Sequence, residues 1–458
     1  MQSLTVREII EATGGALLSG SDNLTITSVV TNSGEAGEGA LFVPLIGEKF
    51  DAHEFIKAAF DMGASATLTQ KETELLVDKT IIRVDDTKKA FGDIAAFYKK
   101  KYRIPTVAVT GSVGKTTTKD MTAAALGQKY NTIKTPNNFN NDIGVPITVL
   151  SQEKEHEAAV VEVGMNHFGE IERLVEIVRP DAAIITNIGM SHIENLGSRE
   201  GILKAKLEVA SYFGRDNTLI INGDDEYLST IEDTGKYKIM RYGLNLNKEK
   251  NGVTAENIVN NGLDGIEFDV SVCGKTYHAA VKLPGVHNVY NALAAICAGI
   301  VFGVSPEDSI KGIESCEYTS QRLQIERNNG IELINDCYNA SPDSMKAALS
   351  VMPYSLQKRR VAVLGDMQEM GDYADDAHYK LGAEIVKNKI DLLITAGKHA
   401  AMIAKGAADL GFENYKCFDK TLEAANCVKR EVRPGDCVLV KASHGMRFEE
   451  IAAAVKEL

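Results

Sequence analysis

A short apolar run that breaks into glycines and then a lysine constrains this chain more than any other feature. Residues 108–117 read Ala-Val-Thr-Gly-Ser-Val-Gly-Lys-Thr-Thr, which predicts a buried strand, a tight loop and the first turn of a helix. The backbone N–H groups of such a loop attract phosphate, Lys115 can reach the outer phosphates, and the Thr116 hydroxyl can bind Mg²⁺. The pattern favours nucleotide binding over an ordinary glycine turn with an exposed lysine.

The loop is shorter than the usual phosphate-binding loop. Strict Walker A spacing would place a glycine where Val109 stands, so the match is to the form Thr-Gly-x-x-Gly-Lys-Thr-Thr. Lys115 is also a candidate catalytic residue, because its ammonium would neutralise charge on the phosphates during transfer. The candidate ATP contacts in the loop are Thr110, Gly111, Ser112, Val113, Gly114, Lys115, Thr116 and Thr117.

Length and composition describe an ordinary enzyme-sized protein. At about 150 residues per domain, 458 residues suggest roughly three domains. The net charge of −13 argues against a large nucleic-acid surface, and seven cysteines without a C-x-x-C pair favour reduced thiols. The first residues lack the apolar core of a signal peptide, and the longest apolar run, 289–304, is too short to span a bilayer. We expect a cytoplasmic monomer with no nucleic-acid partner and no membrane insertion.

Strand-like and helix-like segments alternate along most of the chain. Residues 1–100 mix both kinds, and the basic helix end at 98–103, followed by Pro105, indicates a domain boundary. Beyond it, apolar strands alternate with amphipathic helices, which predicts βαβ units and a mostly parallel sheet. The strands expected there lie at 107–110, 158–163, 182–188 and 218–221.

The second half of the chain adds two further features. Residues 252–283 switch to short alternating strands, which suggests a small antiparallel addition, and a long helix begins near Val286. A second α/β series follows Cys316, with strands expected at 361–364, 392–396 and 438–441. We therefore expect an α/β protein with three domains, at residues 1–100, 101–315 and 316–458.

Two strand ends carry polar side chains at the edge where doubly wound sheets bind ligands. Glu162 ends the run Val160-Val-Glu162, where a role in holding Mg²⁺ or water is favoured over a structural lysine pair. His192 follows the run Thr186-Asn-Ile-Gly-Met-Ser, where contact with a metal or phosphate is favoured over an incidental role. Both are candidate catalytic and metal-binding residues.

Two further segments are less specific. Lys204-Ala-Lys-Leu-Glu208 is typical of a solvated helix face with Lys204 and Glu208 paired four residues apart. Residues 137–141, Asn-Asn-Phe-Asn-Asn, fit a turn and equally a sugar-peptide ligand. Asn137 and Asn138 are therefore candidate substrate contacts.

Several ordered motifs together resemble the Mur ligases, ATP-dependent amide ligases that build the peptidoglycan stem peptide. The later motifs are similar to the signatures of the family members that add D-alanyl-D-alanine, and the resemblance covers essentially the whole chain. The motifs that carry it, in chain order, are the phosphate loop, the Asn-rich loop, Glu162, residues 186–192, Ala205-Lys206, His287-Asn-Val-Tyr-Asn291, Gln321-Arg322, Asp336-Cys-Tyr-Asn-Ala-Ser-Pro-Asp-Ser-Met345 and Leu364-Gly-Asp-Met-Gln-Glu-Met-Gly371.

The resemblance implies an N-terminal UDP-binding domain, a central P-loop ATPase domain and a Rossmann-like C-terminal domain that closes over the nucleotide. It also implies ATP and two Mg²⁺ ions. Thr116 and Glu162 would bind one ion, while His192 and a carbamylated Lys206 would serve the second. The implied nucleotide contacts outside the loop are Asn291, Arg322 and Asp336, the last near the ribose.

The implied substrates are UDP-N-acetylmuramoyl-tripeptide and D-alanyl-D-alanine, joined through an acyl phosphate. Asn339 and Ser341 would help to form the acceptor side. The chain departs from the family at two places. An Asp-Ser-Arg pattern of the UDP domain reads Asn32-Ser33-Gly34, so Ser33 stays a candidate substrate contact but an arginine is missing. Near the end, a Lys-Gly-Ser-Arg-Ser-Met pattern reads Lys441-Ala-Ser-His-Gly-Met446, with His444 in place of arginine.

Two alternatives stay open. Another amide ligase of the superfamily, adding the third stem residue or extending folate with glutamate, would share most of these motifs, although the signature at 336–345 favours D-alanyl-D-alanine. A nucleotide-regulated binding protein without catalysis is the rival of another class. The joint presence of the proposed catalytic and metal-binding residues speaks against it: Lys115, Thr116, Glu162, His192 and Lys206.

Overall fold

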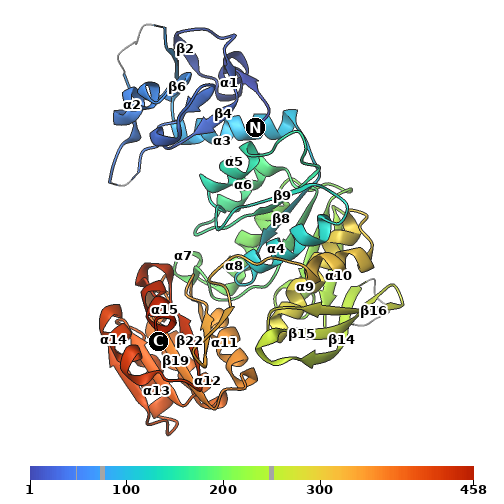
Figure 1. Ribbon diagram of the computed structural model, residues 1–458. Coiled ribbons are helices and arrows are strands. Elements are labelled where there is room, and N and C mark those ends of the chain that lie inside the picture. Colours follow the sequence, from blue (N-terminus) through green and yellow to red (C-terminus); the bar gives the residue numbers. More distant parts are fainter. Residues whose placement is uncertain (48, 73–77, 247–251) are drawn as a thin grey trace. The chain divides into compact units, whose positions relative to one another are not determined.

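The computed structural model describes residues 1–47, 49–72, 78–246 and 252–458 (Figure 1). These residues fall into two compact units. Unit 1 comprises residues 1–108, 130–164 and 170–181, and unit 2 comprises residues 109–129, 165–169 and 182–458. The three domain ranges expected from the sequence stay a prediction.

Unit 1 contains an N-terminal sheet with the strand order β2-β7-β6-β5-β4. Its parallel strands β4 to β7 pack Phe42 and Ile81 into a core with helix α2. The segment 24–30 is divided between two sheets, because β3 pairs with β1 and β4 pairs with β5. The elements are β1 (Leu4–Thr5), α1 (Val6–Thr13), β2 (Ala16–Ser19), β3 (Thr25–Ile26), β4 (Ser28–Val30), β5 (Ala40–Phe42), α2 (Ile56–Asp61), β6 (Ala66–Thr69), β7 (Thr80–Arg83) and α3 (Thr87–Lys101).

Unit 1 also holds part of a second sheet. Strand β8 begins here and ends in unit 2, and β9 pairs in parallel with β10. The apolar runs that predicted β8 and β10 are confirmed, since both strands are buried along their whole length. The elements are β8 (Thr106–Thr110), β9 (Thr132–Lys134), α5 (Gly144–Leu150), β10 (Ala158–Glu162) and α6 (Glu170–Val178).

The first half of unit 2 continues the alternation of strands and helices. Its strands run in the order β16-β15-β14-β13-β12-β11-β8. Pairing is parallel from β11 to β14 and antiparallel from β14 to β16, as the switch in pattern predicted. The elements are α4 (Lys115–Leu126), β11 (Ala182–Ile185), α7 (Ile193–Leu196), α8 (Arg199–Leu207), β12 (Thr218–Asn222), β13 (Lys238–Gly243), β14 (Gly252–Asn260), β15 (Ile266–Val272), β16 (Lys275–Val281), α9 (Val286–Val301) and α10 (Pro306–Glu314).

The second half of unit 2 is a Rossmann-like layer structure with helices on both sides of its sheet (Figure 1). The strand order is β17-β18-β22-β19-β20-β21, parallel from β18 onward. Its core packs the sheet against α14 and α15. The elements are β17 (Gln324–Asn328), β18 (Ile331–Asn335), α11 (Pro342–Val351), β19 (Arg359–Gly365), α12 (Ala374–Lys387), β20 (Leu392–Ala396), α13 (Ala401–Ala408), β21 (Tyr415–Phe418), α14 (Thr421–Glu431), β22 (Asp436–Lys441) and α15 (Glu449–Lys456).

The α/β fold class expected from the sequence is confirmed, since the nine-stranded and six-stranded sheets are mostly parallel and alternate with helices. The sequence analysis missed the edge strands β17 and β21, whose side chains are mostly half-buried or exposed and therefore lack a long apolar run. It also missed β18, which is buried along its whole length but carries the polar residues Glu332 and Asn335. Within the described residues, no helix combines the length and apolar character needed to cross a bilayer.

Helices α12 and α13 approach each other through two glycines. A Cβ atom on Gly382 would lie 2.2 Å from the backbone nitrogen of Ala407, and one on Gly406 would lie 2.1 Å from the carbonyl oxygen of Tyr379. Backbone atoms cannot move aside as a flexible side chain can, so this crossing requires glycine on both helices.

Gly382→Ala should therefore lower the free energy of unfolding of the C-terminal half by about 1–3 kcal/mol, because overpacking outweighs the gain in helix propensity. Thermal and denaturant unfolding followed by circular dichroism measures the change. Gly214→Ala is the control, since a Cβ there would have its nearest neighbour at 3.9 Å. Equal stability of the two variants would contradict the packing argument.

Candidate active site

The phosphate loop folds as the sequence predicts, between β8 and α4. Its glycines are required by geometry. Gly111 has a φ of 144°, and a Cβ there would lie 1.9 Å from Oγ1 of Thr186. Gly114 has a φ of 86°, and a Cβ there would lie 2.7 Å from Oδ1 of Asn291. Only glycine therefore fits at either end of this turn.

The end of β11 holds the loop in shape. The Thr186 hydroxyl donates to the carbonyl oxygen of Val113 at 2.6 Å. The side-chain amide of Asn187 binds both backbone groups of Val113, accepting from its N–H at 3.0 Å and donating to its carbonyl at 2.8 Å. The backbone N–H of Ser112 donates to the Asn187 carbonyl at 3.1 Å. The loop is thus a preformed cradle at the N-terminus of α4, which suits an anion.

Lys115 lies over this cradle. Its Nζ donates to the carbonyl oxygens of Gly111 at 2.9 Å and Ser112 at 3.3 Å. The ammonium is therefore held at the loop that would surround the phosphates. Thr116, one residue into α4, is 2 % exposed. The hydroxyl of Thr110 is buried without a hydrogen-bond partner among the described residues.

Lys206 is buried, although its local sequence is typical of an exposed helix face. It lies on α8 with 2 % exposure, so the interpretation of this segment as a solvated face is wrong for Lys206. Burial, and to a lesser extent the charge of Lys115, hold the pKa of its amine well below the usual value. No carboxylate pairs with its Nζ within the part of the chain that the structure describes. A buried amine of lowered pKa is neutral in part, which is the state that carbamylation needs.

The neighbouring residues on α8 differ from Lys206. Lys204 is exposed, and its Nζ lies 5.8 Å from the ring centroid of Phe168. Glu208 accepts a hydrogen bond from the backbone N–H of Gly169 at 2.8 Å. Lys206 is therefore buried between an exposed Lys204 and a half-buried Glu208.

His192 lies on the loop after β11, with a left-handed backbone (φ 63°). Its Nδ1 lies 2.6 Å from Oε2 of Glu369, a residue of the C-terminal half. The contact has the distance of an ion pair but not the angle of a hydrogen bond. The same loop is held by Asp343, whose Oδ2 accepts from the backbone N–H of Met190 at 3.2 Å.

The predicted nucleotide contact Asn291 lies directly below the phosphate loop. Its Oδ1 accepts from the Thr118 hydroxyl at 3.1 Å, and its Nδ2 donates to Oδ1 of Asn288 at 3.0 Å. With Gly114 pressed against it, Asn291 supports the loop from helix α9. Its direct contact with a nucleotide stays a prediction.

The predicted contacts of the C-terminal half form two groups. The guanidinium of Arg322 lies 4.1 Å from the ring centroid of Tyr338, and its buried Nε has no hydrogen-bond partner among the residues the structure describes. The His444 ring lies on Tyr338 as well, at 5.7 Å between centroids. The residue that replaces the family arginine is therefore part of an aromatic stack with a charged guanidinium.

The second group is built around Lys441. Its Nζ donates to Oδ2 of Asp336 at 2.5 Å and to the carbonyl oxygen of Asn339 at 2.9 Å. Ser341 caps helix α11, accepting from the backbone N–H of Ser344 at 3.4 Å. Lys441 had no role in the sequence prediction, although it belongs to a motif that the sequence analysis noted. The ligand-binding roles of Asp336, Asn339 and Ser341 stay predictions.

The remaining predicted residues lie in unit 1. Glu162 is 1 % exposed and accepts from Nδ2 of Asn140 at 2.8 Å, so the Asn-rich loop and the strand end do come together. Asn137 and Asn138 are exposed on that loop. Ser33 begins a short 3₁₀ turn that Asn32 caps. Their substrate contacts stay predictions.

The donor chemistry of the site fits Mg²⁺ bound through a nucleotide. Among the described residues, no three His, Cys, Asp or Glu side chains are grouped to hold a metal. Mg²⁺ does not need such a cage, because it is usually held by one or two protein oxygens together with phosphates and water. The buried Thr116 hydroxyl beside the phosphate loop, and a carbamate on Lys206, would be oxygen donors of that kind.

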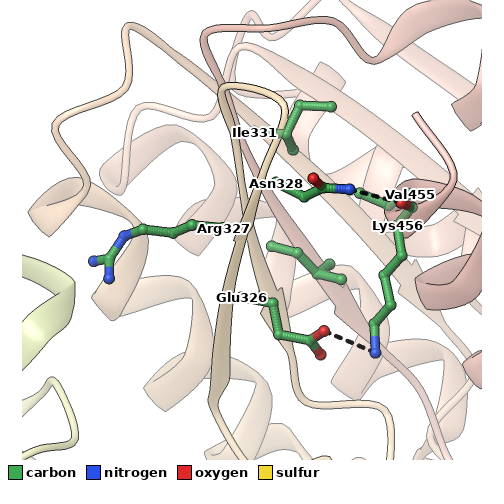
Figure 2. A pocket seen from close by; sticks show the side chains of 7 residues that line it. Glu326, Arg327, Asn328, Ile331, Val455 and Lys456 are labelled. Atoms are coloured by element: carbon green, nitrogen blue, oxygen red, sulfur yellow. Dashed lines mark hydrogen bonds and ion pairs between the residues drawn. The ribbon is translucent and has the colours of Figure 1, made fainter.

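A pocket of about 250 Å³ lies elsewhere in unit 2, between β17 and α15 (Figure 2). Figure 2 shows Glu326 paired with Lys456, at 2.8 Å, and Arg327 directed away from them. None of the predicted site residues lines it. The pocket is therefore separate from the phosphate loop.

Comparisons with known proteins agree with these motifs. The pattern of the Mur ligase middle domain matches residues 109–299, and that of the Mur ligase glutamate ligase domain matches residues 321–444. The chain is 40% identical over 461 residues to the UDP-N-acetylmuramoyl-tripeptide–D-alanyl-D-alanine ligase of Bacillus subtilis (strain 168), covering 99% of this chain and 98% of that relative.

Solved structures give the same result. A crystal structure of MurF from Acinetobacter baumannii matches with a TM-score of 0.91 and 30% identity, over 100% of both chains. The structure of MurF ligase from Thermotoga maritima in complex with ADP matches with a TM-score of 0.82 and 25% identity, over 94% of this chain and 97% of that one. The order of motifs, the preformed phosphate loop and the similarity along the full length agree, and the chain belongs to the Mur ligase family.

Proposed function

We propose that this protein joins D-alanyl-D-alanine to UDP-N-acetylmuramoyl-tripeptide, with ATP converted to ADP and phosphate. The observation that carries the proposal is the full-length similarity to ligases of that name, together with a phosphate loop whose lysine and cradle are in place. We place the reaction in the cytoplasm, where ATP is supplied, and propose that a single chain suffices.

The chemistry needs an activated carboxylate. A carboxylate does not condense usefully with an amine in water, because its leaving group is poor. A carboxylate oxygen of the donor peptide attacks the γ-phosphorus, the bond to the bridging oxygen of ADP breaks, and an acyl phosphate forms. The amine of D-alanyl-D-alanine then attacks the acyl carbon, phosphate leaves, and the amine loses a proton to complete the amide.

The chain's own groups have distinct tasks in this proposal. Lys115 neutralises charge on the transferred phosphoryl group, and the loop N–H groups hold the phosphates in line. Mg²⁺, when bound, would supply further charge neutralisation on the phosphate oxygens. The proposed ligands of one ion are Thr116 and Glu162, and those of a second ion are His192 and carbamylated Lys206.

The C-terminal half completes the nucleotide site in this proposal. Arg322 and Asp336 would contact the nucleotide, while Asn339 and Ser341 would face the acceptor. Exclusion of water by this half would protect the acyl phosphate, which water otherwise hydrolyses. Ser33, Asn137 and Asn138 are the proposed contacts of the UDP-linked donor.

Mass spectrometry of the product is the direct test. The full chain is incubated with ATP, a UDP-N-acetylmuramoyl-tripeptide and D-alanyl-D-alanine, and a product heavier by the dipeptide residue is expected. Single amino acids and glutamate serve as alternative acceptors. A product with one of these, and none with D-alanyl-D-alanine, would identify another ligase of the superfamily, and nucleotide binding without turnover would identify a binding protein.

Lys115→Ala should lower turnover by at least about 10³-fold while the thermal midpoint changes little, because the ammonium acts on transferring charge and does not pack in a core. Phosphate release with all three substrates measures the loss. The exposed Lys204→Ala is the control for a lost surface charge. Turnover near that of the wild type in folded Lys115→Ala would remove the assigned role of the phosphate loop.

Lys206→Ala should lose most activity and regain part of it when short-chain carboxylic acids are added, since these can supply the missing carboxylate oxygens. Lys206→Arg keeps a charge but should stay inactive, because a guanidinium forms no carbamate. Incubation with isotopically labelled bicarbonate should give a carbamate carbon signal in NMR of the wild type that Lys206→Ala lacks. An active Lys206→Arg variant would contradict carbamylation.

A chain ending at Ser315, directly after α10, should bind the UDP-linked donor but lose catalysis and most ATP affinity. The deletion removes Arg322, Asp336 and Lys441 while it leaves the phosphate loop and residues 1–100 intact. Calorimetry with each ligand measures both affinities, after circular dichroism has confirmed folding. Wild-type ATP affinity in this shortened chain would show that the C-terminal half does not complete the nucleotide site.

A further inference from the structure

Glu369 belongs to the Leu364–Gly371 motif, to which the proposed function gives no task, yet its side chain reaches His192. Its Oε2 lies 2.6 Å from Nδ1 of His192, and the His192 side chain holds the pKa of Glu369 below its usual range. The charge of Lys115 contributes in the same direction, which places the carboxylate near the phosphate loop. The Glu369 side chain is 47% exposed, so burial in a packed core does not explain its position.

The segment before Glu369 is fixed by three successive hydrogen-bonded residues. Asp366 accepts from the backbone N–H groups of His399 and Ala400, at 2.9 and 2.7 Å. The N–H of Met367 donates to Nε2 of His378 at 2.9 Å, and the N–H of Gln368 donates to the Ser443 hydroxyl at 2.9 Å. This framework determines where the next side chain can point.

His378 gives the framework its rigidity. It is 0% exposed, and its Nδ1 lies 2.6 Å from the carbonyl oxygen of Ala374 while Nε2 accepts from Met367. A carbonyl only accepts and an N–H only donates, so the ring is neutral with its proton on Nδ1. Burial lowers the pKa of His378, in agreement with a neutral ring.

Both partners of the contact also have constrained backbones. Glu369 and His192 are non-glycine residues with left-handed φ angles of 61° and 63°. Such conformations are costly and persist only where surrounding contacts enforce them. Near His192, Asp343 accepts a hydrogen bond from the backbone N–H of Met190. Near Glu369, Gly371 lies against the side chain of Glu194.

The carboxylate also determines which ring nitrogen of His192 carries the proton. A negatively charged oxygen 2.6 Å from a ring lone pair would be repelled, whereas it attracts a nitrogen that carries hydrogen. Of the two forms of the neutral ring, the contact therefore favours the one with the proton on Nδ1 and the lone pair on Nε2. Metal-binding histidines are commonly oriented by a carboxylate that accepts a hydrogen bond from their other nitrogen. The carboxylate of Glu369 lies at the distance of such a contact, without its angle.

We propose that Glu369 is a positioning residue that orients His192 and keeps its proton on Nδ1, so that the Nε2 lone pair is available to Mg²⁺ bound with the nucleotide. This inference rests on the proposed function, in which His192 serves the second Mg²⁺. It means that docking of the C-terminal half prepares a metal ligand in the first half of unit 2.

Mn²⁺ binding is the test, because its paramagnetism reports binding without turnover. The full-length wild type, Glu369→Gln and Asp372→Asn are titrated with Mn²⁺ in the presence of ADP. Asp372 is exposed, and Asp372→Asn removes the same charge three residues away from Glu369. Glu369→Gln should bind Mn²⁺ about 10-fold more weakly, with metal-free ADP affinity and thermal midpoint unchanged, and Asp372→Asn should match the wild type.

Nitrogen NMR of labelled histidine should show the His192 signal, identified by its loss in His192→Ala, change from the Nδ1-protonated form to a mixture in Glu369→Gln. Unchanged Mn²⁺ affinity and an unchanged His192 signal would overturn the proposal. Tighter Mn²⁺ binding in Glu369→Gln would also overturn it, because the carboxylate would then block His192. Glu369-dependent Mn²⁺ binding without ligase product would instead contradict the proposed function and leave the orienting role intact.

Discussion

The close approach between the phosphate loop and the end of β11 is the constraint on which the rest of the site depends. Gly111 lies so near Thr186 that no side chain fits, and the amide of Asn187 binds both backbone groups of Val113. The loop N–H groups are therefore oriented before any ligand arrives. The binding energy of a ligand does not have to offset an entropy cost of ordering the loop. Lys115 lies over a surface that is already formed.

Charge explains why other groups gather at this loop. Lys115 and Lys206 are close enough for one to lower the pKa of the other, and Lys206 is buried. Lys115 is half-buried, and two cations at this distance would repel, so the pair is stabilised when the Lys206 amine is neutral or when anions are present. A bound nucleotide or a carbamate would supply negative charge, and Glu369 adds a carboxylate from the C-terminal half.

The C-terminal half reaches His192 through the loop that follows strand β19. The Asp366–Gly371 segment leaves β19, is held by α12 and the segment after β22, and ends at His192. These hydrogen bonds thus set the position of one carboxylate, that of Glu369. A change in this framework would move the carboxylate relative to His192.

Sequence patterns predicted much of this and failed at identifiable points. The glycines, Lys115 and the buried strands with an unbroken apolar run, such as β8 and β10, were readable because each is a local property: a tight turn, a reachable ammonium, an apolar run. Edge strands β17 and β21 were missed because their burial is partial. Asn187, Lys441 and Glu369 belong to motifs found in the sequence, but their roles were not predicted. Their contact partners lie far along the chain.

By itself, the sequence determined the fold class, the phosphate loop and, through a resemblance along its full length, the family. Tertiary structure decided the state of individual side chains. Lys206 is a surface residue by local pattern and a buried amine in the folded protein, and His192 acquires a carboxylate from 177 positions further along the chain, at Glu369. The physical reason is that periodicity records which side of a helix or strand is apolar, whereas burial and charge at a site are sums over neighbours that only folding brings together.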